Sequence, residues 1–458
     1  MNTKEHITTS IFELFKIGPG PSSSHTIGPM KAALNFLNIC LKLPTEKIAT
    51  ATSIEVYLYG SLSATGKAHG TDRAIVAGLL GWVPENCDPI EFSSLLTDAN
   101  KKYSIIVNEK IFSFQLLNIH FERGKFDFPH ANTLILKLMN ENNILHEEEY
   151  YSIGGGFIVR KGEVVDKKNK IPKYPYSTME DVKSILENKK ISIIDLMVEN
   201  EKNISGLSKE EIDQKIDNIL SFMHKAIDRG ILSDEILPGS IQLHRKAKYL
   251  YSQAEQRKNS QEGFLMFLNS YCEAASEENA AGNIVVTAPT SGASGVIPGV
   301  TYLMKKHFQY DEQKIREGML VAALIGFLVK HNASISGAEM GCMGEIGTAS
   351  AMSASMLCYC AGYSINVIEA AAEIAIEHHL GMTCDPIGGY VQIPCIERNA
   401  MGAVKAYNAY LLASSGNQAY QKISLDSVIK VMKATGNDMS KKYKETSEAG
   451  LALSSTEC

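Results

Sequence analysis

Apolar and polar residues alternate along several short segments in the first third of the chain. The segment SIEVYLY at residues 53–59 carries Ile, Val and Leu at every second position. Alternation with a period of two predicts strands with one buried face. The segments with strand-like patterns are residues 53–59, 103–107, 118–121, 133–136 and 150–160. Because helical patterns lie between them, the sequence predicts an α+β domain over residues 1–165.

A different pattern follows the charged, proline-containing stretch KGEVVDKKNKIPKYP at residues 161–175, which we interpret as a linker. Beyond it, apolar residues recur at three- and four-residue spacing, which is typical of amphipathic helices. The predicted helices cover residues 181–201, 208–229, 240–256 and 262–279. We therefore expect the second domain, residues 176–458, to be all-α.

Two long apolar stretches raise the question of membrane insertion. Residues 318–329 are uncharged for only twelve positions, which is too short to cross a bilayer. Residues 346–368 are long enough but contain many small and polar residues, so a helix surrounded by protein is the better interpretation. The N-terminus lacks the basic start and apolar run of a signal peptide. We expect a cytoplasmic protein without a membrane span.

Composition narrows the class of partner. The chain of 458 residues has a net charge of -6, with 45% hydrophobic and 21% charged residues, as in ordinary globular proteins. No stripe of Lys and Arg is present to neutralise phosphates, so we expect a small-molecule substrate and no nucleic acid. Nine cysteines are an odd number in a large chain, which favours free or metal-bound thiols over disulfides.

A proline-stiffened loop at residues 18–26 (GPGPSSSHT) precedes a predicted helix. It brings Ser22, Ser23, Ser24 and His25 close to the start of that helix, where backbone N–H groups bind carboxylates well. The alternative is a serine N-cap with an exposed imidazole. The spacing alone leaves both interpretations open.

Two further polar loops contain glycine. Residues 63–72 present Lys67, His69 and Asp72, without the Walker spacing of a nucleotide site, and such loops are more often solvated turns. Residues 282–299 present Thr290 and Ser291 among small residues. A loop of this kind can offer several N–H donors to one anion, and close helix packing explains it equally well.

The cysteines carry more chemistry. Cys342 lies in GAEMGCMGE, whereas Cys384 and Cys395 lie eleven residues apart in a segment framed by Pro386 and Pro394. Three thiolates without a close fourth suit a 4Fe-4S cluster with one open iron, which a Lewis-acid catalyst requires. The spacing leaves two alternatives open, a zinc site that includes nearby histidines and buried inert cysteines.

Five segments together resemble the bacterial iron-sulfur L-serine dehydratases in their single-chain, two-domain form. They are GPGPSSSHTIGP, TGKAHGTD, TAPTSGASGVIPG, SGAEMGCMGEIG and GMTCDPIGGYVQIPC, the last followed by IERN. The resemblance implies an N-terminal domain similar to the allosteric substrate-binding domain of some D-3-phosphoglycerate dehydrogenases. It further implies a helical catalytic domain with a 4Fe-4S cluster on Cys342, Cys384 and Cys395. One departure is PHANT at residues 129–133, where the family more often has His-Pro-Asn-Thr.

The activity implied by the resemblance is the conversion of L-serine to pyruvate and ammonia, in amino-acid catabolism and gluconeogenesis, by a homodimer. The serine hydroxyl is a poor leaving group, so an open iron would assist its departure. The α-proton is weakly acidic, so a positioned base would remove it. His69 is the first candidate for the base, His25 the second and Lys67 the third. A pyridoxal-phosphate dehydratase using Lys67, a serine-sensing binding protein and a zinc hydrolase are the competing interpretations.

Substrate contacts follow from the same segments. The candidates for holding the carboxylate are Ser22, Ser23, Ser24, Thr290, Ser291 and Gly292. The candidates for the amino group are Asn132 and Asp72. Cys458, the last residue, is either a loose thiol at a frayed end or a fourth ligand that caps the open iron until serine displaces it.

Overall fold

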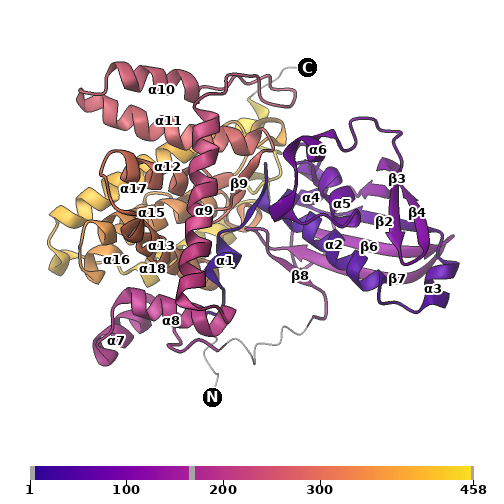
Figure 1. Ribbon diagram of the computed structural model, residues 1–458, viewed down its shortest axis with the longest axis horizontal. Helices are drawn as coiled ribbons and strands as arrows, with labels where there is room; N and C mark the ends of the chain where they lie inside the picture. Colours follow the sequence, from indigo (N-terminus) through magenta and orange to yellow (C-terminus); the bar gives the residue numbers. More distant parts are fainter. Residues whose placement is uncertain (1–5, 164–170, 455–458) are drawn as a thin grey trace.

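The computed structural model describes residues 6–163 and 171–454. Its first half is built on a five-stranded sheet with the order β5-β2-β6-β7-β8 (Figure 1). β2 pairs in parallel with β5 and antiparallel with β6, so the sheet is mixed. The strands are β2 (Ser53–Leu58), β5 (Ile119–Phe121), β6 (Thr133–Asn140), β7 (Asn143–Ser152) and β8 (Ile158–Arg160). This half has the predicted α+β character.

Helices and a separate hairpin complete this half. α2 packs on α5 and on β7, and buries Phe36 against Leu58 and Tyr150 in one apolar core. The alternating burial of β2 follows its sequence pattern, because Ile54, Val56 and Leu58 face that core. The remaining elements are α2 (Gly28–Cys40), α3 (Thr45–Thr50), α4 (Ser61–Thr65), α5 (Thr71–Leu79), α6 (Pro89–Ser94) and the hairpin β3 (Tyr103–Val107) with β4 (Lys110–Phe114).

The second half is helical, as the spacing of its apolar residues predicted. Its first helices are α7 (Met179–Lys189), α8 (Ile193–Ser205), α9 (Lys209–Gly230), α10 (Ala247–Gln256), α11 (Gln261–Ala280) and α12 (Val296–Lys306). The others are α13 (Glu312–Asn332), α14 (Gly337–Met340), α15 (Thr348–Cys360), α16 (Ile365–Glu377), α17 (Cys395–Ser415) and α18 (Leu425–Asp438). The fold class expected from the sequence is therefore confirmed.

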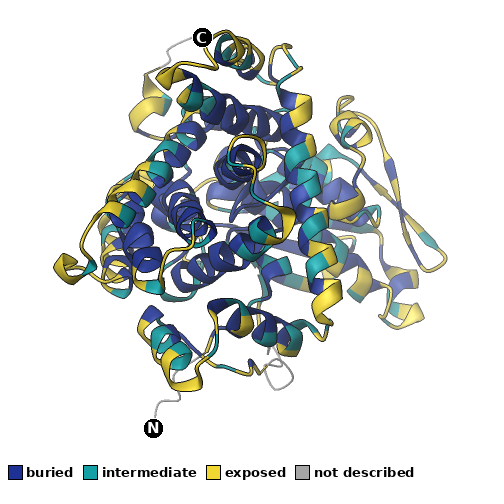
Figure 2. Ribbon diagram, turned by 60° about the vertical axis from the view of Figure 1, so that its left-hand side comes forward, coloured by how far each residue is buried: buried dark blue, intermediate teal, exposed yellow. Residues whose placement is uncertain are grey.

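The two apolar stretches form the centre of the helical half. α13 is buried from Gly318 to Val329, and almost all of α15 is buried as well. Figure 2 shows such buried helices at the centre, with helices that are exposed on one side around them. In the part of the chain that the structure describes, no helix has both the length and the apolar character needed to span a membrane.

The first elements of the chain lie against the helical half. α1 (Ile11–Leu14) contributes Ile11 and Leu14 to its core, and β1 (Ile17–Pro19) pairs antiparallel with β9 (Ile284–Val286). This two-stranded ribbon brings the polar loop after residue 20 next to the polar loop after residue 286. Two loops far apart in the sequence therefore meet between the two halves.

Local details differ from the sequence expectations. The helix predicted over residues 181–201 is interrupted after α7, because Lys190 adopts a left-handed φ of 52° and Ser192 caps α8 in a capping box with Asp195. The helix predicted from residue 240 begins at Ala247. Glycines at 154–156 have φ of +56° to +88°, and a Cβ on Gly154 would lie 3.0 Å from Ser336. They form a turn that touches the helical half closely.

Candidate active site

Two short π-helical segments carry the main polar motifs. The first, η1 (Ser23–Ile27), runs directly into α2, and the second, η6 (Met343–Gly347), runs directly into α15. π-Helical turns are rare and occur frequently at functional sites. Both turns lie beside one pocket between the two halves of the molecule. It is lined by Ser22, His69, Gly292, Cys342, Glu345, Ile346, Cys384, Pro386, Val391, Cys395 and Glu445.

The three cysteines predicted as ligands all line this pocket. Cys342 immediately precedes η6, Cys384 lies in the loop after α16, and Cys395 is the first residue of α17. Each is buried, with at most 7% of its surface exposed. Ligand atoms of Cys342, Cys384 and Glu345 lie within 4.8 Å of one another. The structure therefore brings together three thiols from separate elements, and a soft metal or an iron-sulfur cluster prefers such a donor set.

The electrostatics of these thiols are uneven. A hydrogen bond from Cys384 lowers the pKa of Cys342, and the guanidinium of Arg398 lowers it further. The same contact with Cys342, together with burial, raises the pKa of Cys384 well above its usual range. Burial likewise raises the pKa of Cys395. Cys342 is therefore the thiol that loses its proton most readily, and a bound cation would favour the thiolate form of all three.

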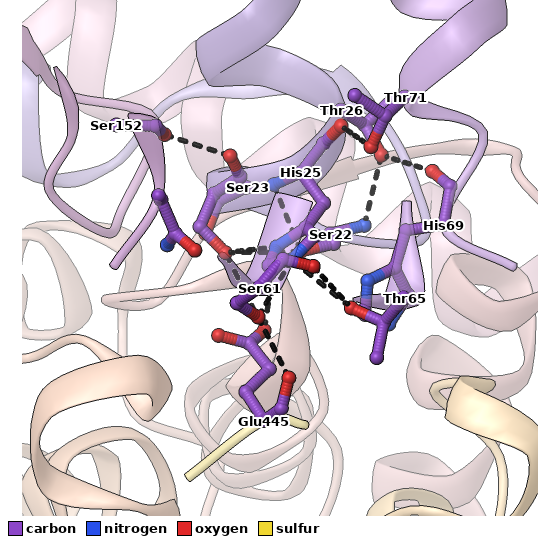
Figure 3. A network of polar contacts seen from close by, with 12 residues as sticks. Ser22, Ser23, His25, Thr26, Ser61, Thr65, His69, Thr71, Ser152 and Glu445 are labelled. Carbon is purple, nitrogen blue, oxygen red and sulfur yellow. Dashed lines mark hydrogen bonds and ion pairs between the residues drawn. The ribbon is translucent and has the colours of Figure 1, made fainter. Parts of the chain in front are cut away.

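Two buried imidazoles, His25 and His69, face each other with ring centroids 4.5 Å apart (Figure 3). Nδ1 of His25 lies 2.9 Å from Oγ of Ser24, and its Nε2 lies 3.1 Å from the hydroxyls of Ser61 and Thr65. Neither ring nitrogen of His69 has a hydrogen-bond partner among the described residues. The two loops are tied together because Thr26 donates to the carbonyl of His69. His25 is held in place, whereas His69 presents free nitrogens to the pocket.

Burial keeps both imidazoles neutral. It lowers the pKa of His25 to about 4. Burial also lowers the pKa of His69 well below 6.5, and the neighbouring His25 adds to that effect. A neutral imidazole with a free nitrogen can accept a proton.

The loop at residues 22–24 and the loop at residues 290–292 meet in the structure. The backbone N–H of Ser291 donates to Oγ of Ser23 at 3.2 Å, which joins the loop before α2 to the loop before α12. Oγ of Ser22 accepts from the N–H of His25 at 3.2 Å and lies 3.2 Å from Oγ of Ser24. The side chains of Asn132 and Ser291 are fully buried but have no hydrogen-bond partner in the described chain. Buried polar groups without partners are costly and mark a place for a polar ligand.

Two carboxyl groups in the pocket were missed by sequence reasoning. Glu345 lies in η6, and burial raises its pKa to about 7. A Cβ on Gly292 would lie 2.9 Å from Oε1 of Glu345, so a side chain at this position would displace the carboxyl group of Glu345. Glu445 comes from the C-terminal segment, and burial together with Glu345 raises its pKa well above its usual range. Glu345 lies only three residues from Cys342, which is a signal the sequence did contain.

The first turn of α17 supplies two further residues that sequence reasoning did not assign. Nη1 of Arg398 donates to the carbonyl of Thr383, next to Cys384, at 2.7 Å. Nδ2 of Asn399 lies 2.8 Å from the carbonyl of Gly292 and 2.9 Å from that of Cys395. Both belong to the motif IERN, which follows Cys395 directly. They connect the backbone of the thiol-bearing segments to each other and to the Gly292 loop.

Three other predicted residues, Lys67, Asp72 and Thr290, are not among those that line the pocket. Lys67 is exposed, with Nζ 5.2 Å from the ring centroid of Phe121. Asp72 is half-buried at the start of α5, where Oδ1 accepts from the N–H of Arg73. Thr290 is buried, and its hydroxyl partly offsets the rise that burial causes in the pKa of Glu345. Cys458 lies outside the described residues.

Comparisons with known proteins identify the family of this chain. The family model described as serine dehydratase beta chain matches residues 10–163, and the one described as serine dehydratase alpha chain matches residues 188–452. The chain belongs to the serine dehydratase family. An L-serine dehydratase of Haemophilus influenzae is 41% identical, over 97% of this chain and 98% of that protein. L-serine dehydratase 2 of Escherichia coli is also 41% identical, over 98% of this chain and 99% of its own length.

Both parts of this serine dehydratase family member contribute to the pocket. The part that matches the beta chain supplies Ser22 and His69, whereas the part that matches the alpha chain supplies the three thiols and Glu445. The donor set fits an iron-sulfur cluster, because three buried thiols converge and the described residues that line the pocket include no fourth cysteine. A 4Fe-4S cluster held by these three thiols would have one iron without a cysteine ligand from the described residues.

Proposed function

We propose that this chain is an L-serine ammonia-lyase, which converts L-serine to pyruvate and ammonia with a 4Fe-4S cluster on Cys342, Cys384 and Cys395. The observation that carries the proposal is the meeting of three buried thiols and the unpartnered imidazole of His69 in one pocket. The names of the relatives, L-serine dehydratases, support the substrate and the reaction. The cytoplasmic location and the homodimer remain predictions.

The cluster, when bound, supplies an open iron that acts as a Lewis acid toward the serine hydroxyl. The chain's own residues carry the remaining tasks. We assign the abstraction of the α-proton to His69, because its ring nitrogens are unpaired and its environment keeps it neutral. The edge-to-face contact with His25 and the hydrogen bond from the hydroxyl of Thr26 to the backbone carbonyl of His69 fix the position of His69. The exposed position of Lys67 gives it no route to this proton.

The carboxylate of L-serine is assigned to the joined serine loops. Ser22, Ser23 and Ser24 lie at the turn that opens α2, and Ser291 brings a free hydroxyl from the opposite loop. Backbone N–H groups at such turns bind carboxylates well. The amide of Asn132 is unpartnered and remains a candidate for the amino group. Loss of the proton and the hydroxyl gives aminoacrylate, which tautomerises to an imine and hydrolyses in water.

The proposal is tested on protein purified without oxygen. We expect iron and sulfide in equal amounts, broad visible absorption, and pyruvate formation from L-serine. Cys342→Ser should lose both the absorption and the activity. Cys358→Ser is the matched control, because Cys358 is equally buried in α15 but does not line the pocket. Protein that lacks iron and sulfide, or that carries zinc or pyridoxal phosphate instead, would contradict the proposal.

The capping role of Cys458 is a separate proposal about the same cluster. Cys458→Ala should change the resting visible spectrum and the affinity for L-serine, because the fourth iron would lose its internal ligand. An unchanged spectrum and an unchanged affinity would refute the capping role and leave the cluster itself unaffected.

A further inference from the structure

Residues 440–451, which we name the C-terminal strap, cross one side of the pocket and bind directly to the segment around Cys384. The N–H of Cys384 donates to the carbonyl of Tyr443 at 2.8 Å, and the N–H of Glu445 donates back to the carbonyl of Cys384 at 2.7 Å. The N–H of Leu451 donates to Oδ2 of Asp385 at 2.7 Å. The strap is therefore anchored on both sides of Glu445.

The backbone of Glu445 is held in an unusual conformation. Its φ is 58°, in the left-handed region that non-glycine residues rarely adopt. Oγ of Ser61, from the first half of the molecule, donates to its carbonyl at 2.6 Å. Such conformations are kept where surrounding contacts enforce them, and they cluster at active sites and ligand clamps. The contacts here fix where the carboxyl group of Glu445 points.

That carboxyl group points into the pocket toward the two imidazoles (Figure 3). Glu445 has only 6% of its surface exposed. Its Oε1 lies 3.4 Å from Oγ of Ser24 and 3.6 Å from Nδ1 of His25. Its Oε2 has no hydrogen-bond partner among the described residues. One ligand atom from each of Glu445, His25 and His69 lies within 4.8 Å of the other two.

Among the described residues, the carboxyl group of Glu445 has no Lys or Arg partner, and its contact at 3.6 Å is with the imidazole of His25. The described residues that line the pocket include no Lys or Arg, and the nearby imidazoles are kept neutral by burial. Arg398 lies on the side of the thiols, where it donates to the carbonyl of Thr383. A buried carboxyl oxygen without a partner is costly, and a ligand that brings a positive charge to Oε2 of Glu445 would supply that partner.

We propose that Glu445 binds the α-ammonium group of the substrate. This inference rests on the proposed function, because L-serine carries one cationic group and that group must be recognised in the same pocket. It gives Glu445 the role for which the sequence offered Asn132 and Asp72, neither of which lines the pocket. Glu445 is thereby a specificity-determining residue that selects amino acids over hydroxy acids.

The test compares two ligands that differ only in this group, L-alanine and L-lactate. Neither has a β-hydroxyl to eliminate, so their dissociation constants can be measured by calorimetry on the anaerobic holoenzyme without turnover. The wild type should prefer L-alanine. Glu445→Gln should weaken L-alanine binding about tenfold to a hundredfold, as expected for loss of a charge-assisted bond, and should change L-lactate binding less than about threefold. KM for L-serine should rise with the dissociation constant of L-alanine.

Glu448→Gln is the matched control, because Glu448 lies on the same strap but is exposed. It should keep the wild-type preference. Glu445→Asp, which keeps the charge, should retain a preference for L-alanine. This variant tests the proposal if Glu445→Gln does not fold. A wild type without preference between the ligands, an equal loss for both ligands, or a fall in kcat with unchanged KM would overturn the assignment. Absence of pyruvate from wild-type protein would contradict the proposed function instead, since the ligand preference is measured without turnover.

Discussion

Asn399 connects the thiol-bearing helix α17 to the polar loop that faces it, and its replacement by Ala is a direct test of the site architecture. The side chain is fully buried. Its Oδ1 accepts from the N–H of Gly295 at 2.8 Å, and its Nδ2 lies within 3.1 Å of the carbonyls of Gly292 and Cys395 and of Oγ of Ser276. We expect Asn399→Ala to loosen the loop and the thiol together.

The magnitude follows from the groups that the substitution leaves behind. Alanine leaves the N–H of Gly295 and the carbonyl of Gly292 without their side-chain partner in a buried place. Each buried unsatisfied group costs about 1–3 kcal/mol, so the free energy of unfolding should fall by roughly 2–6 kcal/mol. A domain is typically stable by about 5–15 kcal/mol, so the variant should fold with a much lower urea midpoint.

The assay combines urea unfolding with iron content per chain and KM for L-serine. Asn332→Ala is the matched control, because Asn332 also donates to two carbonyls, those of Ser177 and Leu328, but lies at the end of α13. We expect Asn399→Ala to lower iron content and raise KM, and Asn332→Ala to change neither. If Asn399→Ala loses stability while iron content and KM stay at wild-type values, Asn399 supports the fold alone and the reasoning is refuted.

Three further predictions concern single side chains. His69→Gln should lower kcat by about 10²–10⁴-fold with iron content unchanged. Lys67→Gln should keep kcat within about twofold of the wild-type value because Lys67 is exposed. Equal losses of pyruvate formation in the two variants would contradict the assignment of the base. Burial lowers the pKa of His224 to about 4, so the unfolded chain, with a pKa of about 6.5, binds the proton first as the pH falls. The free energy of unfolding should therefore decrease by roughly 3 kcal/mol between pH 6.5 and 4 from this group, and His224→Gln should flatten that decrease in urea titrations at several pH values. Glu278→Ala should cost about 3–5 kcal/mol, because it removes the buried carboxylate 2.9 Å from the fully buried guanidinium of Arg245 and leaves that guanidinium only the exposed Glu235. A loss below about 1 kcal/mol in urea unfolding would show that Glu235 alone compensates the charge of Arg245.

The spacing of apolar residues predicted the fold class, because both the two-residue period of strands and the three- to four-residue spacing of helices are strong in this chain. β2 alternates between buried and half-buried residues along its whole length, as the sequence pattern predicted. The attachment of α1 and β1 to the helical half could not be predicted in the same way. Whether Ile11 and Leu14 pack on the first or the second core depends on contacts with distant segments, which local periodicity does not contain.

Some of the site residues were predictable from the sequence and others were not. The three cysteines and His69 lie in segments rich in Gly and Pro, which made those segments recognisable, and the structure places all four around one pocket. Glu445 lies in the polar segment YKETSE, which reads as an exposed turn, and only the backbone pairing with Cys384 turns it inward. Lys67 shares a loop with His69, but the turn between α4 and α5 exposes one side chain and buries the other. Residues two positions apart in such a turn do not share a face.

The pocket is assembled across the two halves of the molecule, so the position of the first half affects the geometry of the pocket. The N–H of Ser291 reaches across to Ser23, and Ser61 reaches across to the carbonyl of Glu445. A small displacement of the first half would therefore move the proposed base, His69, relative to the thiols and to Glu445, which is bonded to the backbone of Cys384. Catalysis is sensitive to shifts of about 1 Å in such groups, so any ligand that changes the position of the first half would change turnover without touching the cluster.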